Sequence, residues 1–176
     1  DFDNDGDQDL AVASYGMVII ANNEKQKGFV PSVILNTSWS TASMAAADYD
    51  NDGLLDLYVC NYVEEDNGES IGVTNNQFVY HDAENGASNA LFKNETKEAG
   101  KFSFVNVTEG VGLNINNTRW SFAASWEDYD NDGDQDLYVA NDYGRNNLYK
   151  NDGGKFIDVA AGTNTEDSAS GMSVTW

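Results

Sequence analysis

The sequence predicts an all-β protein made of repeated four-stranded units, and three observations lead to this prediction. First, an Asp-rich decamer occurs three times, as DFDNDGDQDL, DYDNDGLLDL and DYDNDGDQDL, beginning at residues 1, 48 and 128. Second, each decamer is followed by short apolar and aromatic runs, partly alternating, with Asn, Gly and Asp turns between them. Third, recurrence at intervals of several tens of residues is typical of repeat architectures.

Each unit is expected to contain one strand before the decamer and three after it. The runs directly after the decamers are 9–16, 56–63 and 136–144. The second runs are 16–23, 90–95 and 147–152, and the third are 27–34, 101–108 and 155–162. The runs that lead into a decamer are 41–48 and 120–128, and residues 171–176 resemble them. Four short strands with polar turns are the composition of a β-propeller blade.

The chain is therefore interpreted as one propeller segment of about three blades. Blade 1 covers about 1–38 without a leading strand, blade 2 about 39–117, blade 3 about 118–168, and 169–176 begins another blade. Residues 63–89 form a polar insert in blade 2, and loops of this length are often functional. Since propellers typically have four to eight blades, we expect the sequence to be an excerpt from a longer protein.

The composition excludes several classes of protein. A net charge of -21 and a pI near 4.1 argue against nucleic acid and anionic membrane surfaces as partners, because both require a basic surface. A hydrophobic content of 40% is too high for a disordered acidic tail. The chain has no apolar run long enough to span a bilayer, so direct membrane insertion is not expected. Cys60 is the only cysteine and is expected to be a buried structural thiol.

The decamers are predicted to be cation-binding loops. Positions 1, 3, 5 and 9 of every copy are Asp, and position 6 is Gly, which permits a sharp turn. Ca²⁺ prefers six to eight oxygen ligands, and alternate carboxylates on a curled loop, with the position 7 carbonyl, would supply them. About three Ca²⁺ ions are expected. The predicted ligands of the three loops are Asp1, Asp3, Asp5, Asp7 and Asp9; Asp48, Asp50, Asp52, Leu54 and Asp56; and Asp128, Asp130, Asp132, Asp134 and Asp136.

The decamers have three other interpretations. An EF-hand requires a bidentate Glu at position 12, where this chain has Val12, Val59 and Val139 within β-type runs. Asp, Asn and Gly also favour turns without any metal, so solvated hairpins are an alternative. Magnesium is a further alternative, although it is less suited to a cage made only of protein carboxylates.

The third unit, DYDNDGDQDLYVAND followed by NNLYKNDGGKFIDV, resembles the FG-GAP/VCBS repeat of integrin-α-like β-propellers. Within that group, DLYVCNYV, a long insert, ALFKNE and the SGMSVTW segment resemble the cartilage-acidic-protein-like branch associated with ASPIC/UnbV modules. The FG-GAP phrase itself is replaced by SFAAS and SMAAA, so the comparison with integrins is one of fold. In the family, positions 1, 3, 5 and 9 and the position 7 carbonyl bind Ca²⁺.

The resemblance implies a secreted, cell-surface or periplasmic protein that acts as a non-enzymatic scaffold in cell adhesion, with a protein or carbohydrate ligand. The alternative is a propeller-based polysaccharide lyase or hydrolase, or a non-catalytic part of one. An enzyme would need a convergent set of side chains on the face away from the decamers, where Tyr80, His81 and Arg145 are candidates. The four tryptophans are expected to pack between blades rather than bind sugars.

Overall fold

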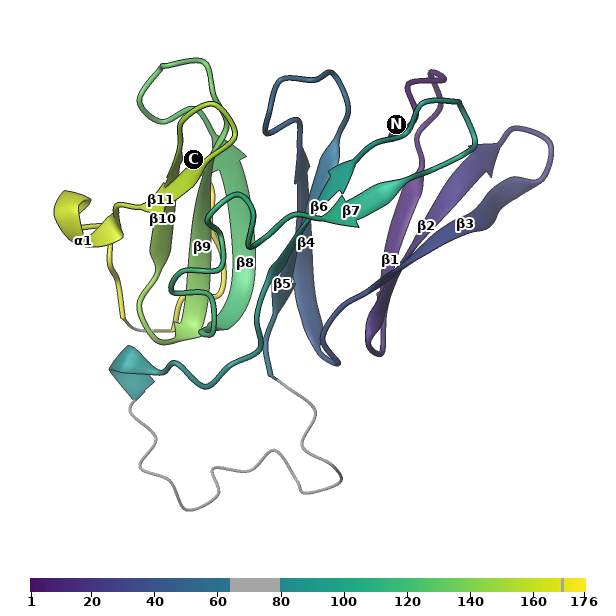
Figure 1. The fold of residues 1–176 in the computed structure, drawn as a ribbon. Helices are drawn as coiled ribbons and strands as arrows, with labels where there is room; N and C mark the ends of the chain where they lie inside the picture. The colour runs from purple at the N-terminus through teal and green to yellow at the C-terminus, as the bar shows by residue number, and fades with distance from the viewer. Residues whose placement is uncertain (64–79, 169) are drawn as a thin grey trace.

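The computed structural model describes residues 1–63, 80–168 and 170–176 and contains three antiparallel sheets that stand side by side (Figure 1). The first sheet has three strands, and each of the other two has four. In sheet order, the strands are β1 (Leu10–Ser14), β2 (Met17–Glu24) and β3 (Gly28–Asn36); β4 (Thr41–Ala47), β5 (Asp56–Asn61), β6 (Ala90–Asn94) and β7 (Phe104–Asn106); and β8 (Trp120–Glu127), β9 (Asp136–Tyr143), β10 (Asn147–Asn151) and β11 (Phe156–Asp158).

This architecture confirms the predicted all-β class and its blade-like repeats. Each sheet is a meander of sequential strands, and every strand pairs with its neighbour in antiparallel register. The Asp decamers lie at one end of the blades, and the 3₁₀ helix η1 (Tyr80–Asp82) lies at the opposite end (Figure 1). Residues 64–79, which make up most of the predicted insert 63–89, lie outside the described residues. None of the helices among the described residues has the length and apolar content needed to cross a bilayer.

Strand β5 shows how one short strand holds two neighbouring sheets together. All six of its residues are buried, so both faces of the strand contribute to a core. Leu57 and Val59 belong to the core between the first and second sheets. Tyr58 and Cys60 belong to the core between the second and third sheets, as expected for residues that alternate along a strand. The Cys60 side chain is fully buried, which confirms the predicted structural thiol and raises its pKa to about 12.

The outer strands of the second and third sheets are shorter than the sequence predicts. The expected runs were 101–108 and 155–162, but β7 ends at Asn106 and β11 ends at Asp158. In both cases a side-chain oxygen accepts a hydrogen bond from the backbone N–H two residues later, at Thr108 (3.1 Å) and Ala160 (3.1 Å). Such Asx turns redirect the chain, and after β11 it enters the short helix α1 (Ala160–Thr163).

The C-terminal segment 170–176 contains no strand in this structure and lies along the third sheet. Gly171 N–H donates to the Asn141 carbonyl at 3.0 Å, and the Trp176 ring stacks on Tyr129 at 6.4 Å. Trp126 packs between sheets, with its ring 6.2 Å from Tyr58 and 6.0 Å from Phe156. For Trp126, therefore, the prediction of packing between blades is confirmed.

Candidate metal loops

The three decamers have the same backbone conformation. The Asn at position 4 has a left-handed φ in each loop, between 57° and 62°, and the Gly at position 6 has a φ between 89° and 97°. A side chain at position 6 would be strained at this φ, which is the physical reason why all three copies have glycine there. The predicted sharp turn at Gly6, Gly53 and Gly133 is therefore present.

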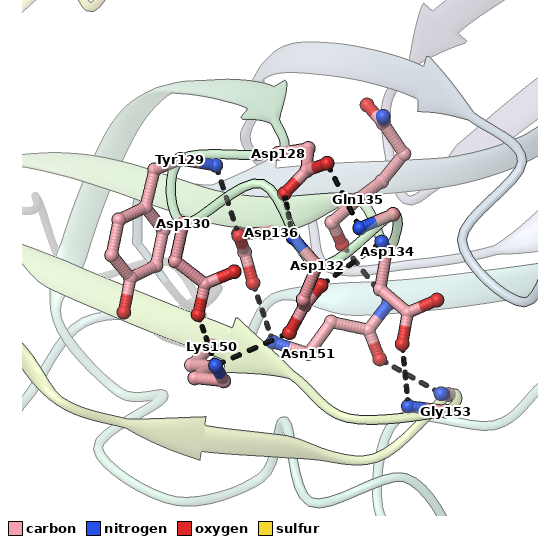
Figure 2. Close-up of polar contacts among 12 residues, drawn as sticks. Asp128, Tyr129, Asp130, Asp132, Asp134, Gln135, Asp136, Lys150, Asn151 and Gly153 are labelled. Carbon is pink, nitrogen blue, oxygen red and sulfur yellow. Dashed lines mark hydrogen bonds and ion pairs between the residues drawn. The ribbon is translucent and has the colours of Figure 1, made fainter.

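Two of the carboxylates organise each loop through hydrogen bonds to its backbone. The position 1 carboxylate accepts the N–H groups of positions 5 and 6, as Asp128 does from Asp132 (3.0 Å) and Gly133 (2.9 Å) (Figure 2). The position 5 carboxylate accepts the N–H of position 7, as Asp132 does from Asp134 at 3.1 Å. The first and second loops repeat these bonds. These hydrogen bonds order the backbone of each loop, and they are compatible both with a cation-binding loop and with a metal-free turn.

The position 9 carboxylate ties the loop to the neighbouring strand. Asp56 is fully buried and accepts the N–H of Tyr49 at 3.2 Å and the N–H of Asn94 at 2.7 Å. Asp136 is equally buried and accepts the corresponding N–H groups of Tyr129 and Asn151. Burial raises the pKa of Asp56 to about 7 and raises that of Asp136 as well, despite these hydrogen bonds.

In each loop, three of the predicted ligand side chains converge on one point, with oxygens within 4.8 Å of one another. Positions 1 and 3 belong to the group in all three loops. The third member is position 5 in the first loop and position 9 in the other two. The three groups are Asp1, Asp3 and Asp5; Asp48, Asp50 and Asp56; and Asp128, Asp130 and Asp136.

The remaining predicted ligands lie outside these groups. Asp52 and Asp132 are at position 5 and Asp9 is at position 9, where Asp9 accepts the N–H of Phe2. At position 7, the carboxylates of Asp7 and Asp134 have other partners: Asp7 pairs with Lys25, and Asp134 accepts from Gly153 N–H at 2.7 Å. The position 7 carbonyls, including that of Leu54, stay predicted ligands.

Lysine side chains reach the convergent carboxylate group in two of the three loops. Lys93, on β6, contacts Asp50 and lies 2.9 Å from Asp52 Oδ2. Lys150, on β10, contacts Asp130 and lies 3.2 Å from Asp132 Oδ2 (Figure 2). These ammonium groups partly offset the repulsion among the carboxylates in the second and third loops.

One buried carboxylate oxygen without a hydrogen-bond partner indicates that the loops suit a cation. Asp50 Oδ1 is inaccessible to solvent and has no hydrogen-bond partner, although the other oxygen of the same carboxylate contacts Lys93. A buried carboxylate oxygen without a partner is costly, and a cation held with Asp48 and Asp56 would satisfy it. The all-oxygen donor set is the one that Ca²⁺ prefers, so the residues fit the predicted ion.

A second set of contacts, which was not predicted from the sequence, links the first and second loops to the blade that follows each of them. Asn94 donates from Nδ2 to the Phe2 carbonyl of the first loop at 2.6 Å, and Asn151 donates in the same way to the Tyr49 carbonyl of the second loop at 2.7 Å. Asn4 at position 4 of the first loop donates to the Gly53 carbonyl of the second. The recurring Asn at the end of ALFKN and NLYKN was the available signal.

The opposite end of the blades holds the residues considered for catalysis. His81 is exposed, and the Tyr80 side chain lies outside the described part of the chain. Arg145 donates from Nε to Asp82 Oδ1 at 3.1 Å and from Nη1 to Glu166 Oε2 at 2.9 Å. Arg145 is thus engaged by two carboxylates, and the described residues do not form a convergent catalytic set around it.

Comparison with known families identifies the repeat independently of this geometry. A family model described as an FG-GAP-like repeat matches residues 1–59 and 128–176, which together make up more than half of the chain. A comparison with curated proteins returned no significant match. The family match includes all three decamers in full and does not extend to the ASPIC/UnbV branch.

Proposed function

Because the chain belongs to the FG-GAP-like repeat family, we propose that it is a Ca²⁺-binding β-propeller segment that acts as a non-catalytic scaffold. The observation that carries the proposal is the convergence of three carboxylates in every loop, together with the buried, unpartnered Asp50 Oδ1. The side chains that would hold the ions are the three convergent groups, with the remaining position 5 and position 9 carboxylates and the position 7 carbonyls as further donors.

A bound divalent cation would supply positive charge at the centre of each acidic loop. The residues of this chain supply the rest of the structure around the ion. Hydrogen bonds within each loop hold the carboxylates in place, and the side chains of Asn94 and Asn151 connect the first and second loops to the blade that follows each of them. Binding to the folded state alone would then stabilise the protein as the Ca²⁺ concentration rises. The rigid blades would present their surface loops to a protein or a carbohydrate.

The proposal places the protein outside the cytosol, as the resemblance implies. Extracellular calcium modules bind with dissociation constants on the order of 10⁻⁴–10⁻³ M, so such loops fill where Ca²⁺ is abundant. Two exposed aromatic side chains, Tyr15 and Trp39, lie with their rings 5.0 Å apart at the far end of the first sheet and offer one surface for a partner.

The test is a calcium titration by calorimetry, with thermal melts in Ca²⁺, Mg²⁺ and EDTA. We expect about three ions to bind and the melting temperature to rise selectively with Ca²⁺. Asp130→Asn should remove about one ion, whereas Glu109→Gln, which removes an exposed carboxylate outside the loops, should leave the stoichiometry unchanged. An absence of binding heat and of any Ca²⁺-dependent shift would contradict the proposal.

A further inference from the structure

The three blades have different residues at one equivalent strand position, and this difference distinguishes the first loop from the other two. The residues Asn23, Asn94 and Asn151 each donate their backbone N–H to the position 9 carboxylate of their own blade, at 3.1, 2.7 and 2.7 Å. This shared bond aligns the three blades residue by residue. The preceding residue is then Asn22 in the first blade, but Lys93 in the second and Lys150 in the third.

Both lysines reach the group of carboxylates that would bind the cation. Lys93 contacts Asp50, and Lys150 contacts Asp130, and each of these aspartates belongs to the convergent group of its loop. The lysine side chains are only 23% and 35% exposed, so the ion pairs are partly shielded from water. An ammonium and a divalent cation on the same carboxylate would repel each other, because charges a few ångströms apart interact strongly in a partly buried site.

The first loop has no such ammonium on its convergent group among the described residues. Asn22 is neutral, and its buried Oδ1 has no hydrogen-bond partner. Lys25, which contacts this loop, is 75% exposed and pairs with Asp7 Oδ2 at 3.2 Å. Asp7 lies outside the group formed by Asp1, Asp3 and Asp5, so this ion pair leaves that group open.

We propose that Lys93 and Lys150 are internal competitors of the divalent cation at the second and third loops, while no lysine of the described residues competes at the first loop. This inference rests on the proposed function, because it describes how the same loops are regulated. The lysines would hold the acidic loops together at low Ca²⁺ and leave the carboxylates as the ion binds. The loops should therefore fill in order, with the first loop filling at the lowest Ca²⁺ concentration.

The test compares Lys93→Gln and Lys150→Gln with the wild-type chain by calcium calorimetry at constant pH and ionic strength. Each variant should raise the affinity of its own loop by about tenfold, the effect of removing one charge-assisted contact. Lys27→Gln is the matched control, because it removes the same charge from an exposed lysine that pairs with Glu24. The reverse substitution, Asn22→Lys, should weaken binding at the first loop.

Terbium offers a readout that is specific to the second and third loops. Tyr49 and Tyr129 occupy position 2 of these loops, whereas the first loop has Phe2. The Lys93 ammonium lies 5.9 Å from the centre of the Tyr49 ring, so an ion that replaces it would be close enough for tyrosine-sensitised emission. Lys93→Gln should shift the terbium titration to lower concentration. In EDTA, the same variant should melt at a lower temperature than wild type, and in saturating Ca²⁺ this difference should disappear, because the lysine no longer contacts the carboxylates once the ion is bound.

The outcomes separate this inference from the proposed function. If the wild type binds Ca²⁺ and Lys93→Gln and Lys150→Gln bind it no more tightly than Lys27→Gln, the competition is refuted and the calcium function stands. If neither the wild type nor any variant binds a cation, both are refuted. A lower melting temperature in EDTA that returns to the wild-type value in saturating Ca²⁺ would support the competition, because a general loss of folding would lower the melting temperature in both conditions.

Discussion

The inter-blade asparagine of the third blade provides a strong test of how the loops are held. Asn151 is fully buried and uses its whole side chain. Its Nδ2 donates to the Tyr49 carbonyl at 2.7 Å and to the Gln135 carbonyl at 3.0 Å, and its Oδ1 accepts from Gly154 N–H at 2.8 Å. One side chain thus joins the third blade's own loop, its outer turn and the loop of the preceding blade.

The substitution Asn151→Ala should lower the free energy of unfolding by about 3–5 kcal/mol. Three hydrogen bonds are lost at a net value of about 1 kcal/mol each, and their partners become unpaired in a buried setting, which adds to the cost. In a domain of 150–250 residues, 1 kcal/mol corresponds to about 2–4 °C, so the melting temperature should fall by roughly 10 °C.

The repeat provides a graded series for the assay. Asn94→Ala should cost about as much, because Asn94 makes the corresponding bonds to Phe2 and Leu55. Asn23→Ala should cost less, because the amide of Asn23 donates to Gln8 alone, at an exposed site. Asn114→Ala is the control, since Asn114 is exposed and its side chain makes no hydrogen bond with the described residues.

Urea denaturation in EDTA and in Ca²⁺ would measure all four variants. A loss below about 1 kcal/mol for Asn151→Ala would refute the reasoning, because it would mean that the three contacts are replaced by water without cost. A loss for Asn23→Ala equal to that for Asn151→Ala would show that the link to the preceding blade contributes nothing.

Two further predictions concern the buried loop carboxylate and a tight backbone contact. The pKa of Asp56 is about 7 in the folded chain and 3.8 in the reference state, so without a cation the fold should lose stability as the pH rises from about 4 to 8, by up to about 4 kcal/mol. Urea denaturation of the cation-free protein should show this loss, and a flat wild-type profile would contradict it. Asp56→Asn should reduce the loss without abolishing it, because burial also raises the pKa of Asp136. Gly144→Ala should destabilise the protein by about 2 kcal/mol or more, because φ is +92° and a Cβ would lie 2.6 Å from the Ala83 carbonyl oxygen. Gly16→Ala is the control, because Gly16 has a φ of +73° and open space around it, so this variant incurs only the backbone strain. Equal decreases in melting temperature for the two variants would contradict a cost from the contact with the Ala83 carbonyl oxygen.

Much of the fold followed from local patterns in the sequence. The positions of the strands followed from apolar runs between turn residues, and the turn at Gly53 followed from its place in the decamer. The ends of β7 and β11 did not follow, because an Asx turn depends on where the side chains of Asn106 and Asp158 point. The same limit applied to position 9, where the pattern identified Asp56 as a ligand but not as the acceptor of two backbone N–H groups.

By itself, the sequence determined the repeat, the strand order and the acidic loops, because turn preference, strand alternation and the freedom of glycine act over a few neighbouring residues. Only the tertiary structure decided which distant groups meet. Asn94 reaches Phe2 across 92 residues, and Lys93 reaches Asp50 across 43. Such contacts depend on how one sheet packs against the next and on the direction of each side chain. No local pattern encodes either property, so the connection between loops and blades became visible only in three dimensions.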